Sequence, residues 1–170
     1  MTIISGGNSA NYEWFKFTKD VGRVNNLRIG ESIFLGTEAL HRKVIPGLFT
    51  NAFTLVTEVI ESKIKPSKPY GEISLNSNGE IQKFKDQGLI KRAILAIGRQ
   101  DVIISGITPR QNIVILGASS DHIVVDSAKS NLKVGDTVEF DLNYNALLRV
   151  LSSSYITKNI IDFNECKNIL

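Results

Sequence analysis

Two short polar segments near the N-terminus contain residue types that bind anions. Ser9 lies within residues 7–11, where a short apolar run gives way to a turn before a predicted helix. Arg28, Gly30 and Glu31 form a second turn after another apolar run. Unpaired backbone N–H groups at strand-to-helix turns bind phosphate, and a hydroxyl or guanidinium group beside them adds a donor. An ordinary turn explains either segment alone, but two in succession predict a phosphate site.

Further polar residues follow apolar runs in the middle of the chain. Arg99 and Asp101 come after one such run, and Ser120, Asp121 and His122 separate two others. The first segment is either a surface turn with an Arg–Asp pair or a functional loop, because binding residues often lie on loops after buried strands. The sequence has no G-x-S-x-G motif, so a hydrolytic triad that includes His122 is not expected.

The sequence predicts no metal site. His41 and His122 are the only histidines, they lie far apart, and neither has a carboxylate at metal-ligand spacing. Cys166 is the only cysteine, which excludes a disulfide framework, and we interpret it as incidental.

Composition and charge are typical of a globular protein. The 170 residues carry 20 basic and 17 acidic side chains, and the net charge is +3. This length suits one ordinary domain. The densest basic stretch, residues 63–68, is expected to be a solvated loop, so nucleic-acid binding is not expected. No apolar run reaches the roughly 18 residues of a membrane span. Residues 1–20 also lack a signal-peptide pattern, so we expect a soluble cytoplasmic protein.

The N-terminal part of the chain has the pattern of an α/β protein. Residues 1–36 predict a strand, a turn, a helix, a second strand and a second turn, with the first strand at residues 2–4. Two parallel strands cannot bury both faces of a sheet on their own. We therefore expect residues 1–45 to be a piece of a larger α/β architecture.

From Pro46 onward the pattern changes to that of a small β domain. Short β-branched runs separated by Asn, Gly, Ser and Pro predict an antiparallel barrel or sandwich over residues 46–170. Residues 143–151 predict a short helix that is capped by Asn143 or Asn145. The expected strands fall at residues 52–60, 91–98, 113–117, 122–126 and 137–141.

Six strings of the sequence together resemble the C-terminal part of the pyridoxal-phosphate-dependent amino-acid racemases of the alanine racemase superfamily. They are SGGNSAN, LRIGESIFLG, AFTLVTEVIE, KRAILAIGRQDV, ILGASSDHIVVD and KVGDTVEFDLNYNALLRVLSS. The resemblance covers nearly the whole chain and is strongest to the branch that contains ornithine racemases. It implies the last two βα units of a TIM-type barrel, followed by a mainly antiparallel β domain with a short C-terminal helix. It also implies an active site between the barrel of one subunit and the β domain of another.

The resemblance implies a set of contacts to pyridoxal 5'-phosphate. Ser9 would bind the cofactor phosphate, together with the backbone amides of Gly30 and Glu31. Arg28 would face the pyridine nitrogen, disfavour its protonation and so limit electron withdrawal into the ring.

The resemblance also implies contacts to the substrate. Ser120 and Asp121 match the segment that meets the substrate carboxylate, where backbone N–H groups would be the donors. Arg99 stands where the alanine enzymes have a tyrosine base, and a guanidinium group is a poor base. The identity of the catalytic base stays open among Asp101, Asp121 and His122.

Two features of the family have no match in this sequence. No lysine occurs in the context of the Schiff-base lysine, which lies on the first barrel strand. The terminal tyrosine of the alanine enzymes is also without a match, since Ile160 stands nearest and Tyr155 lies close by.

These patterns lead to one preferred hypothesis and one alternative. We expect the C-terminal portion of a racemase for a basic amino acid such as ornithine or lysine, inactive without an N-terminal barrel half as its partner. The alternative is a non-catalytic β-domain module that forms a homo-oligomer and binds a phosphorylated small molecule or a protein. A β-barrel that binds nucleic acid ranks last, because the aromatic residues cluster at residues 12–17, outside the predicted barrel.

Overall fold

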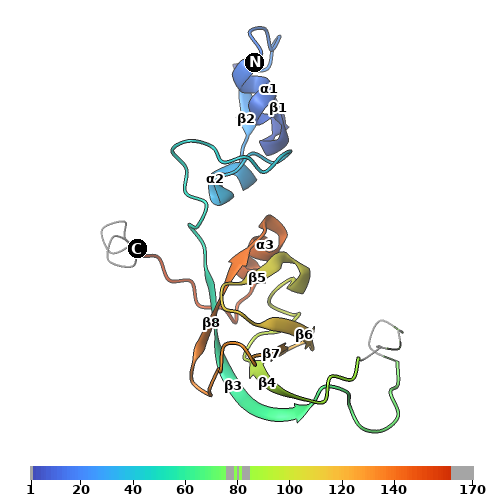
Figure 1. Ribbon diagram of the computed structural model, residues 1–170. Coiled ribbons are helices and arrows are strands. Elements are labelled where there is room, and N and C mark those ends of the chain that lie inside the picture. The colour runs from blue at the N-terminus through green and yellow to red at the C-terminus, as the bar shows by residue number, and fades with distance from the viewer. Residues whose placement is uncertain (1, 76–78, 80, 82–84, 162–170) are drawn as a thin grey trace.

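The larger part of the chain forms a six-stranded antiparallel sheet (Figure 1). The computed structural model describes residues 2–75, 79, 81 and 85–161, so Cys166 lies outside the described residues. The strands are β3 (Leu55–Pro66), β4 (Leu89–Leu95), β5 (Ile107–Pro109), β6 (Val114–Ala118), β7 (Ile123–Asp126) and β8 (Thr137–Leu142). They lie in the order β5-β8-β3-β4-β7-β6 and curl into a nearly closed barrel. Of the two predicted alternatives, an antiparallel barrel or a sandwich, the barrel is confirmed.

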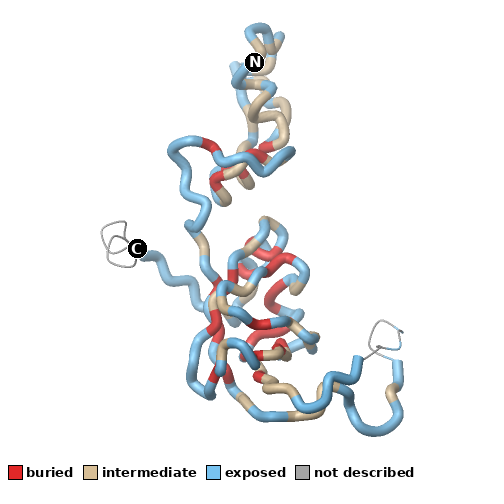
Figure 2. The backbone as a smooth tube through the Cα atoms, viewed as in Figure 1, coloured by how far each residue is buried: buried red, intermediate tan, exposed pale blue. Residues whose placement is uncertain are grey.

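The hydrophobic core lies inside this barrel, as the buried segments in Figure 2 show. Every second residue of β3 from Leu55 to Val59 is buried, and β8 contributes the fully buried Val138 and Phe140. Such alternation is required of a strand that has one face in the core. Each buried aliphatic side chain contributes about 1.5–3 kcal/mol. The remaining core side chains are Ala93, Leu95, Ile97, Val102, Ile107, Ile113, Ile123, Val125, Leu132, Ala146 and Val150.

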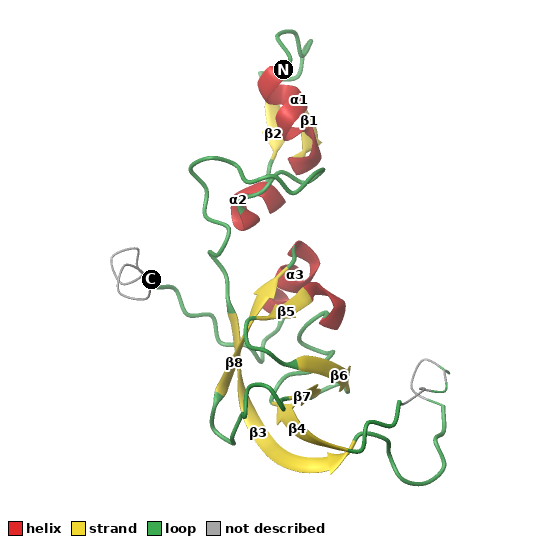
Figure 3. Cartoon of the chain, in the orientation of Figure 1, coloured by secondary structure: helices red, strands yellow, loops and turns green. Residues whose placement is uncertain are grey.

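Helix α3 (Tyr144–Ser152) packs against the 3₁₀ helix η2 (Ile104–Gly106) and covers part of the core (Figure 3). The side chain of Asn143 accepts a hydrogen bond from the N–H of Ala146 at 2.9 Å, and the N–H of Asn143 donates to Gly106 at 2.8 Å. An asparagine cap of this kind satisfies an N–H that has no partner within the helix. The predicted helix and the predicted cap at Asn143 are therefore confirmed.

The N-terminal part contains two parallel strands, β1 (Ser5–Asn8) and β2 (Asn26–Arg28). Strand β1 leads into the 3₁₀ helix η1 (Ser9–Asn11) and helix α1 (Tyr12–Phe17), and β2 leads into helix α2 (Glu31–Leu35). The first strand therefore begins at Ser5 instead of covering residues 2–4. The side chain of Asn25 accepts a hydrogen bond from the N–H of Ile4 and donates one to the carbonyl of Thr2. These backbone groups therefore bond to a side chain and not to a neighbouring strand.

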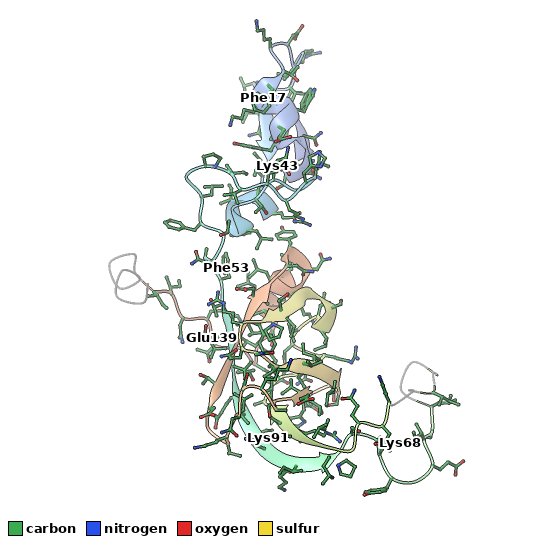
Figure 4. All side chains as sticks on the ribbon, viewed as in Figure 1. Phe17, Lys43, Phe53, Lys68, Lys91 and Glu139 are labelled. Atoms are coloured by element: carbon green, nitrogen blue, oxygen red, sulfur yellow. The ribbon has the colours of Figure 1, made fainter. Side chains whose placement is uncertain are left out.

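Aromatic packing contributes to the junction of the two parts. Phe53 lies on the segment that joins them (Figure 4), and its ring meets Phe34 of α2 edge to face, with 5.7 Å between the ring centroids. Helix α2 also contacts α3. The N-terminal elements are thus placed next to one end of the β domain.

Two details of the β domain differ from the sequence prediction. The basic stretch expected as a loop belongs to β3 as far as Pro66, because β4 pairs with it from Lys63 to Pro66. The short strand β5 is not predicted, since it has only 3 residues and ends in a proline. In the described part of the chain, no helix has the length and apolar character needed to cross a bilayer.

The ion pairs on β3 predict an acid-dependent stability. Hydrogen bonds from Lys65 and Lys63 lower the pKa of Glu61 to about 2, below its ordinary value of 4.5. Ionised Glu61 therefore stabilises the fold above pH 4.5, and this contribution is lost as the pH falls toward 2. We predict that Glu61→Gln lowers the urea midpoint at neutral pH and that its difference from the wild type shrinks as the pH falls through this range.

The matched control is Glu58→Gln on the same strand, because Glu58 forms no ion pair with any described residue. Its effect on the urea midpoint should not follow this pH dependence. A Glu61→Gln effect of equal size at both ends of the pH range would contradict the prediction.

Candidate functional site

The two N-terminal turns meet at the hydroxyl of Ser9. The Ser9 side chain is only 6% exposed, and its Oγ accepts hydrogen bonds from the N–H groups of Gly30 at 3.3 Å and Ser32 at 3.2 Å. The hydroxyl also carries a proton, for which no acceptor is found among the described residues. That proton is available to an anion, so we name Ser9, Gly30 and Glu31 the anion cradle.

Local hydrogen bonds place Ser9 at the start of η1. The side chain of Asn8 accepts from the N–H of Ala10 at 2.9 Å, and Asn11 accepts from the N–H of Asn8 at 3.1 Å. This reciprocal cap gives the backbone N–H groups of Asn8 and Ala10 a hydrogen-bond partner each. Gly7 precedes it with a φ of 89°, a left-handed conformation that favours glycine.

A buried carboxylate holds the loop that follows α2. The side chain of Glu38 accepts hydrogen bonds from the N–H groups of Leu40, His41 and Lys43. Burial acts to raise the pKa of Glu38, but the bonds from Lys43, Leu40 and His41 outweigh it and lower the pKa. Glu38 is therefore a structural residue, which sequence patterning did not single out.

The charged residues of the second turn lie at its surface. Arg28 is exposed at the end of β2, and its guanidinium group donates to the hydroxyl of Ser5 at 3.0 Å. The side chain of Glu31 forms an ion pair with Arg42. The Glu31 carboxylate is therefore directed to a cation, and only its backbone N–H belongs to the anion cradle.

Tyr144 brings a hydroxyl of the β domain to the anion cradle. A Cβ atom on Gly30 would lie 3.3 Å from the Tyr144 hydroxyl oxygen. Ile160 and Tyr155 are the residues nearest the expected position of the family's terminal tyrosine, and both are exposed. No sequence signal at Tyr144 indicates this approach, because it arises from the packing of α2 beside α3.

The second set of polar residues is brought together by Gly98. A Cβ atom on Gly98 would lie 2.2 Å from the carbonyl oxygen of Ser120 and 2.4 Å from the nitrogen of Asp121. Beside it, Arg99 donates to Ser119 at 2.9 Å and Gln100 donates to Ser120 at 3.0 Å through their backbone N–H groups. The two polar loops predicted from the sequence therefore form one surface.

Within this surface, Ser119 holds the second loop. Its hydroxyl accepts from the N–H groups of Asp121 at 3.4 Å and His122 at 3.1 Å. The hydroxyl of Ser120 donates to the Asp121 carboxylate at 2.6 Å. Of the two backbone donors expected to meet an anion, that of Asp121 is thus engaged within the loop, and that of Ser120 has no partner in the described part of the chain.

The Arg–Asp pair considered from the sequence does not form. Asp101 is 7% exposed, and its carboxylate accepts from the hydroxyl of Ser153 at 2.6 Å. The guanidinium Nε of Arg99 donates instead to the carbonyl of Ala118 at 3.0 Å. Asp101 thus anchors the C-terminal end of α3. Residues 99–101 form the predicted turn, with Arg99 and Gln100 exposed, but the expected Arg–Asp pair in it is wrong.

Among the described residues, no cluster of three or more His, Cys, Asp or Glu side chains is arranged to hold a metal ion. The arrangement instead offers two sites of other chemistry. One is the anion cradle, and the other is the surface built by Arg99, Ser120, Asp121 and His122.

Solved structures share this fold. Alanine racemase from Acinetobacter baumannii matches 91% of this chain and 46% of its own chain, with a TM-score of 0.51 and 19% identity. Alanine racemase from Bartonella henselae, whose structure contains covalently bound pyridoxal phosphate, matches 91% of this chain and 42% of its own, with a TM-score of 0.50 and 17% identity. The chain therefore has an alanine racemase-like fold.

Curated relatives narrow the assignment, although no protein-family model matches the chain. The ornithine racemase of Acetoanaerobium sticklandii is 42% identical over 164 residues, which are 95% of this chain and 46% of the relative. The lysine racemase of Thermotoga maritima is 40% identical over 158 residues, 92% of this chain and 45% of the relative. The chain thus spans about half the length of these relatives. It belongs to the alanine racemase superfamily and corresponds to the C-terminal part of such a protein.

The close approach at Gly98 predicts a sensitive position. Gly98→Ala places a methyl group against the backbone of Ser120, so we expect a loss of about 1–3 kcal/mol in the free energy of unfolding. We also expect shifted amide NMR signals at residues 119–122. Gln100→Ala is the control, because Gln100 is exposed on the same turn and bonds Ser120 only through its backbone N–H, which alanine keeps. Unchanged signals in Gly98→Ala would contradict the prediction.

The bond between Asp101 and Ser153 predicts energetic coupling. Asp101→Asn and Ser153→Ala should each cost about 1–3 kcal/mol, because each leaves a polar group with a weakened or absent partner. In a double-mutant cycle by urea unfolding, the two changes should be coupled by at least about 0.5 kcal/mol. Asp121→Asn, at an exposed carboxylate, should change stability by less than about 0.5 kcal/mol. Strict additivity of the two substitutions would show that the bond is not formed in solution.

Proposed function

We propose that this chain is the C-terminal portion of a pyridoxal-phosphate-dependent amino-acid racemase and contributes contacts to the cofactor phosphate and to the substrate carboxylate. The observation that carries the proposal is the buried Ser9 hydroxyl, which joins the two turns and keeps its own proton available. The similarity to ornithine and lysine racemases supports it. In this proposal, residues 1–45 are the last two βα units of a TIM-type barrel and residues 46–170 are the β domain.

The residues of the anion cradle fit a phosphate group. The Ser9 hydroxyl and the backbone N–H of Glu31 would hold it, and the Tyr144 hydroxyl would add a donor from the β domain. The N–H of Gly30 donates to Ser9 Oγ in this structure, so Gly30 would have to release that bond to contact the phosphate directly. Arg28, at the end of β2, would face the pyridine nitrogen. Bound there, the cofactor would stabilise the negative charge that develops when the α-proton of the amino acid is removed.

The surface beside Gly98 would meet the substrate. The N–H of Ser120 would donate to the amino-acid carboxylate, and the proton would be taken up by Asp121 or His122, which are both exposed. Asp101 is the least suitable of the three candidate bases, because its carboxylate is buried and bonded to Ser153. Arg99 would act by its charge, because a guanidinium group is a poor base.

The proposed substrate is a basic amino acid, ornithine or lysine, as in the two relatives. The proposed partner is an N-terminal barrel half, which would carry the covalent lysine, or a further copy in a homo-oligomer. The edges of the two-stranded β1–β2 sheet are consistent with this, because unpaired strand edges are sites of strand addition. We also propose that the protein is located in the cytoplasm.

Reconstitution tests the proposed function. The chain is produced together with the remaining N-terminal part of the Acetoanaerobium sticklandii ornithine racemase, and conversion of L-ornithine is followed by chiral chromatography. We expect racemisation from the pair and none from either part alone. In the pair, Ser9→Ala should raise the cofactor concentration needed for half-maximal activity about tenfold, because a hydrogen bond to a charged phosphate is lost.

Ser154→Ala is the matched control, since Ser154 is exposed and lies in the segment after α3. It should leave the cofactor requirement unchanged. A pair that copurifies and binds pyridoxal phosphate without racemising any amino acid would refute the catalytic assignment. An unchanged cofactor requirement in Ser9→Ala would refute the role of the cradle.

A further inference from the structure

A pocket of about 560 Å³ lies between η2, α3 and β6. It shares Arg99 with the polar surface beside Gly98 and no residue with the anion cradle. Its polar side chains are two arginines and one serine, and the others are aliphatic. The lining residues are Arg99, Val102, Ile103, Ile104, Ser105, Ile115 and Arg149.

The two arginines give the pocket a positive charge that the lining residues do not neutralise. The Nε atom of Arg99 is fixed by the carbonyl of Ala118, which leaves its two terminal nitrogens free to bind a ligand. Arg149 projects from α3, and its side chain has no hydrogen-bond or ion-pair partner in the described part of the chain. No acidic residue lines the pocket. The carboxylate of Asp101, in the same loop as Arg99, is already bonded to Ser153.

Two like charges at one pocket repel each other, and an anion placed between them removes that repulsion. Guanidinium groups bind carboxylates through paired, charge-assisted hydrogen bonds. Both arginines are exposed, so an anion can reach them from the solvent. The charge of the pocket therefore favours an anionic ligand.

The aliphatic side chains that line the pocket indicate an anion with an alkyl chain. Val102 is fully buried beneath the pocket, while Ile103, Ile104 and Ile115 present partly exposed side chains. A small inorganic anion would leave this apolar surface in contact with water, whereas an alkyl chain would cover it. We propose that the pocket binds a small aliphatic carboxylate, with its carboxylate on Arg99 and Arg149 and its chain on the isoleucines.

Titration of the full chain with hexanoate tests this proposal. Binding is followed by the amide NMR shifts of Ile103, Ile104 and Ser105, and hexylamine and hexanol serve as probes of equal length with the opposite charge or none. We expect hexanoate to bind at least about tenfold more tightly than either probe. Arg149→Met should weaken hexanoate binding about tenfold, and Arg149→Lys should weaken it less, because it keeps the charge but not the planar fork.

Arg23→Met is the matched control, because it makes the same change at an exposed arginine of the N-terminal part. It should leave hexanoate binding unchanged, and thermal unfolding should confirm that each variant is folded. Equal affinity for hexanoate and hexanol would show an apolar pocket without charge recognition. That result, an unchanged affinity in Arg149→Met, or the absence of saturable shifts up to about 20 mM hexanoate would overturn the proposal. None of these outcomes depends on the racemase assignment.

Discussion

The contact between Gly98 and the backbone of Ser120 and Asp121 is the constraint on which the polar surface at this end of the β domain depends. The space there excludes a side chain, so the loop after β4 and the loop between β6 and β7 lie against each other and share backbone hydrogen bonds. This contact fixes the position of Arg99, and it also fixes the Ser120 hydroxyl and the Asp121 carboxylate on the facing loop. Neither loop needs a side-chain cross-link, because backbone donors and acceptors already pair.

The anion cradle is held by a side chain and not by backbone pairing. The Ser9 hydroxyl accepts hydrogen bonds from two backbone N–H groups of a turn that is distant in the sequence. Ser9 reaches the start of α2, and the buried Glu38 holds the loop that follows this helix. Tyr144 then links the cradle to the β domain through its approach to Gly30. Both parts of the chain therefore contribute to one site.

Sequence patterning was sufficient where a local rule governs the structure. Short β-branched runs between turn residues indicate the strands of the barrel, an asparagine at 143 or 145 marks the start of α3, and two polar turns indicate the cradle. Patterning failed where tertiary pairing governs the outcome. The lysine-rich segment of β3 has the composition of a loop and becomes a strand because β4 pairs with it. The residues around Asp101 likewise give no sign that α3 will cover its carboxylate. The approach of Tyr144 to the cradle depends on helix packing, which has no signature in a single sequence.

The position of β3 has a consequence for the order in which the barrel assembles. Its second half pairs with β4 from Pro66↔Leu89 onward, within one hairpin, but its first half pairs with β8 from Leu55↔Phe140 to Glu58↔Thr137. Contacts between residues close in sequence form faster than those that close a long loop. During synthesis the hairpin can therefore form early, while the apolar face of the first half of β3 waits for β8 to leave the ribosome. Barrel closure is the late step, and until then the edge of β3 stays open to other chains.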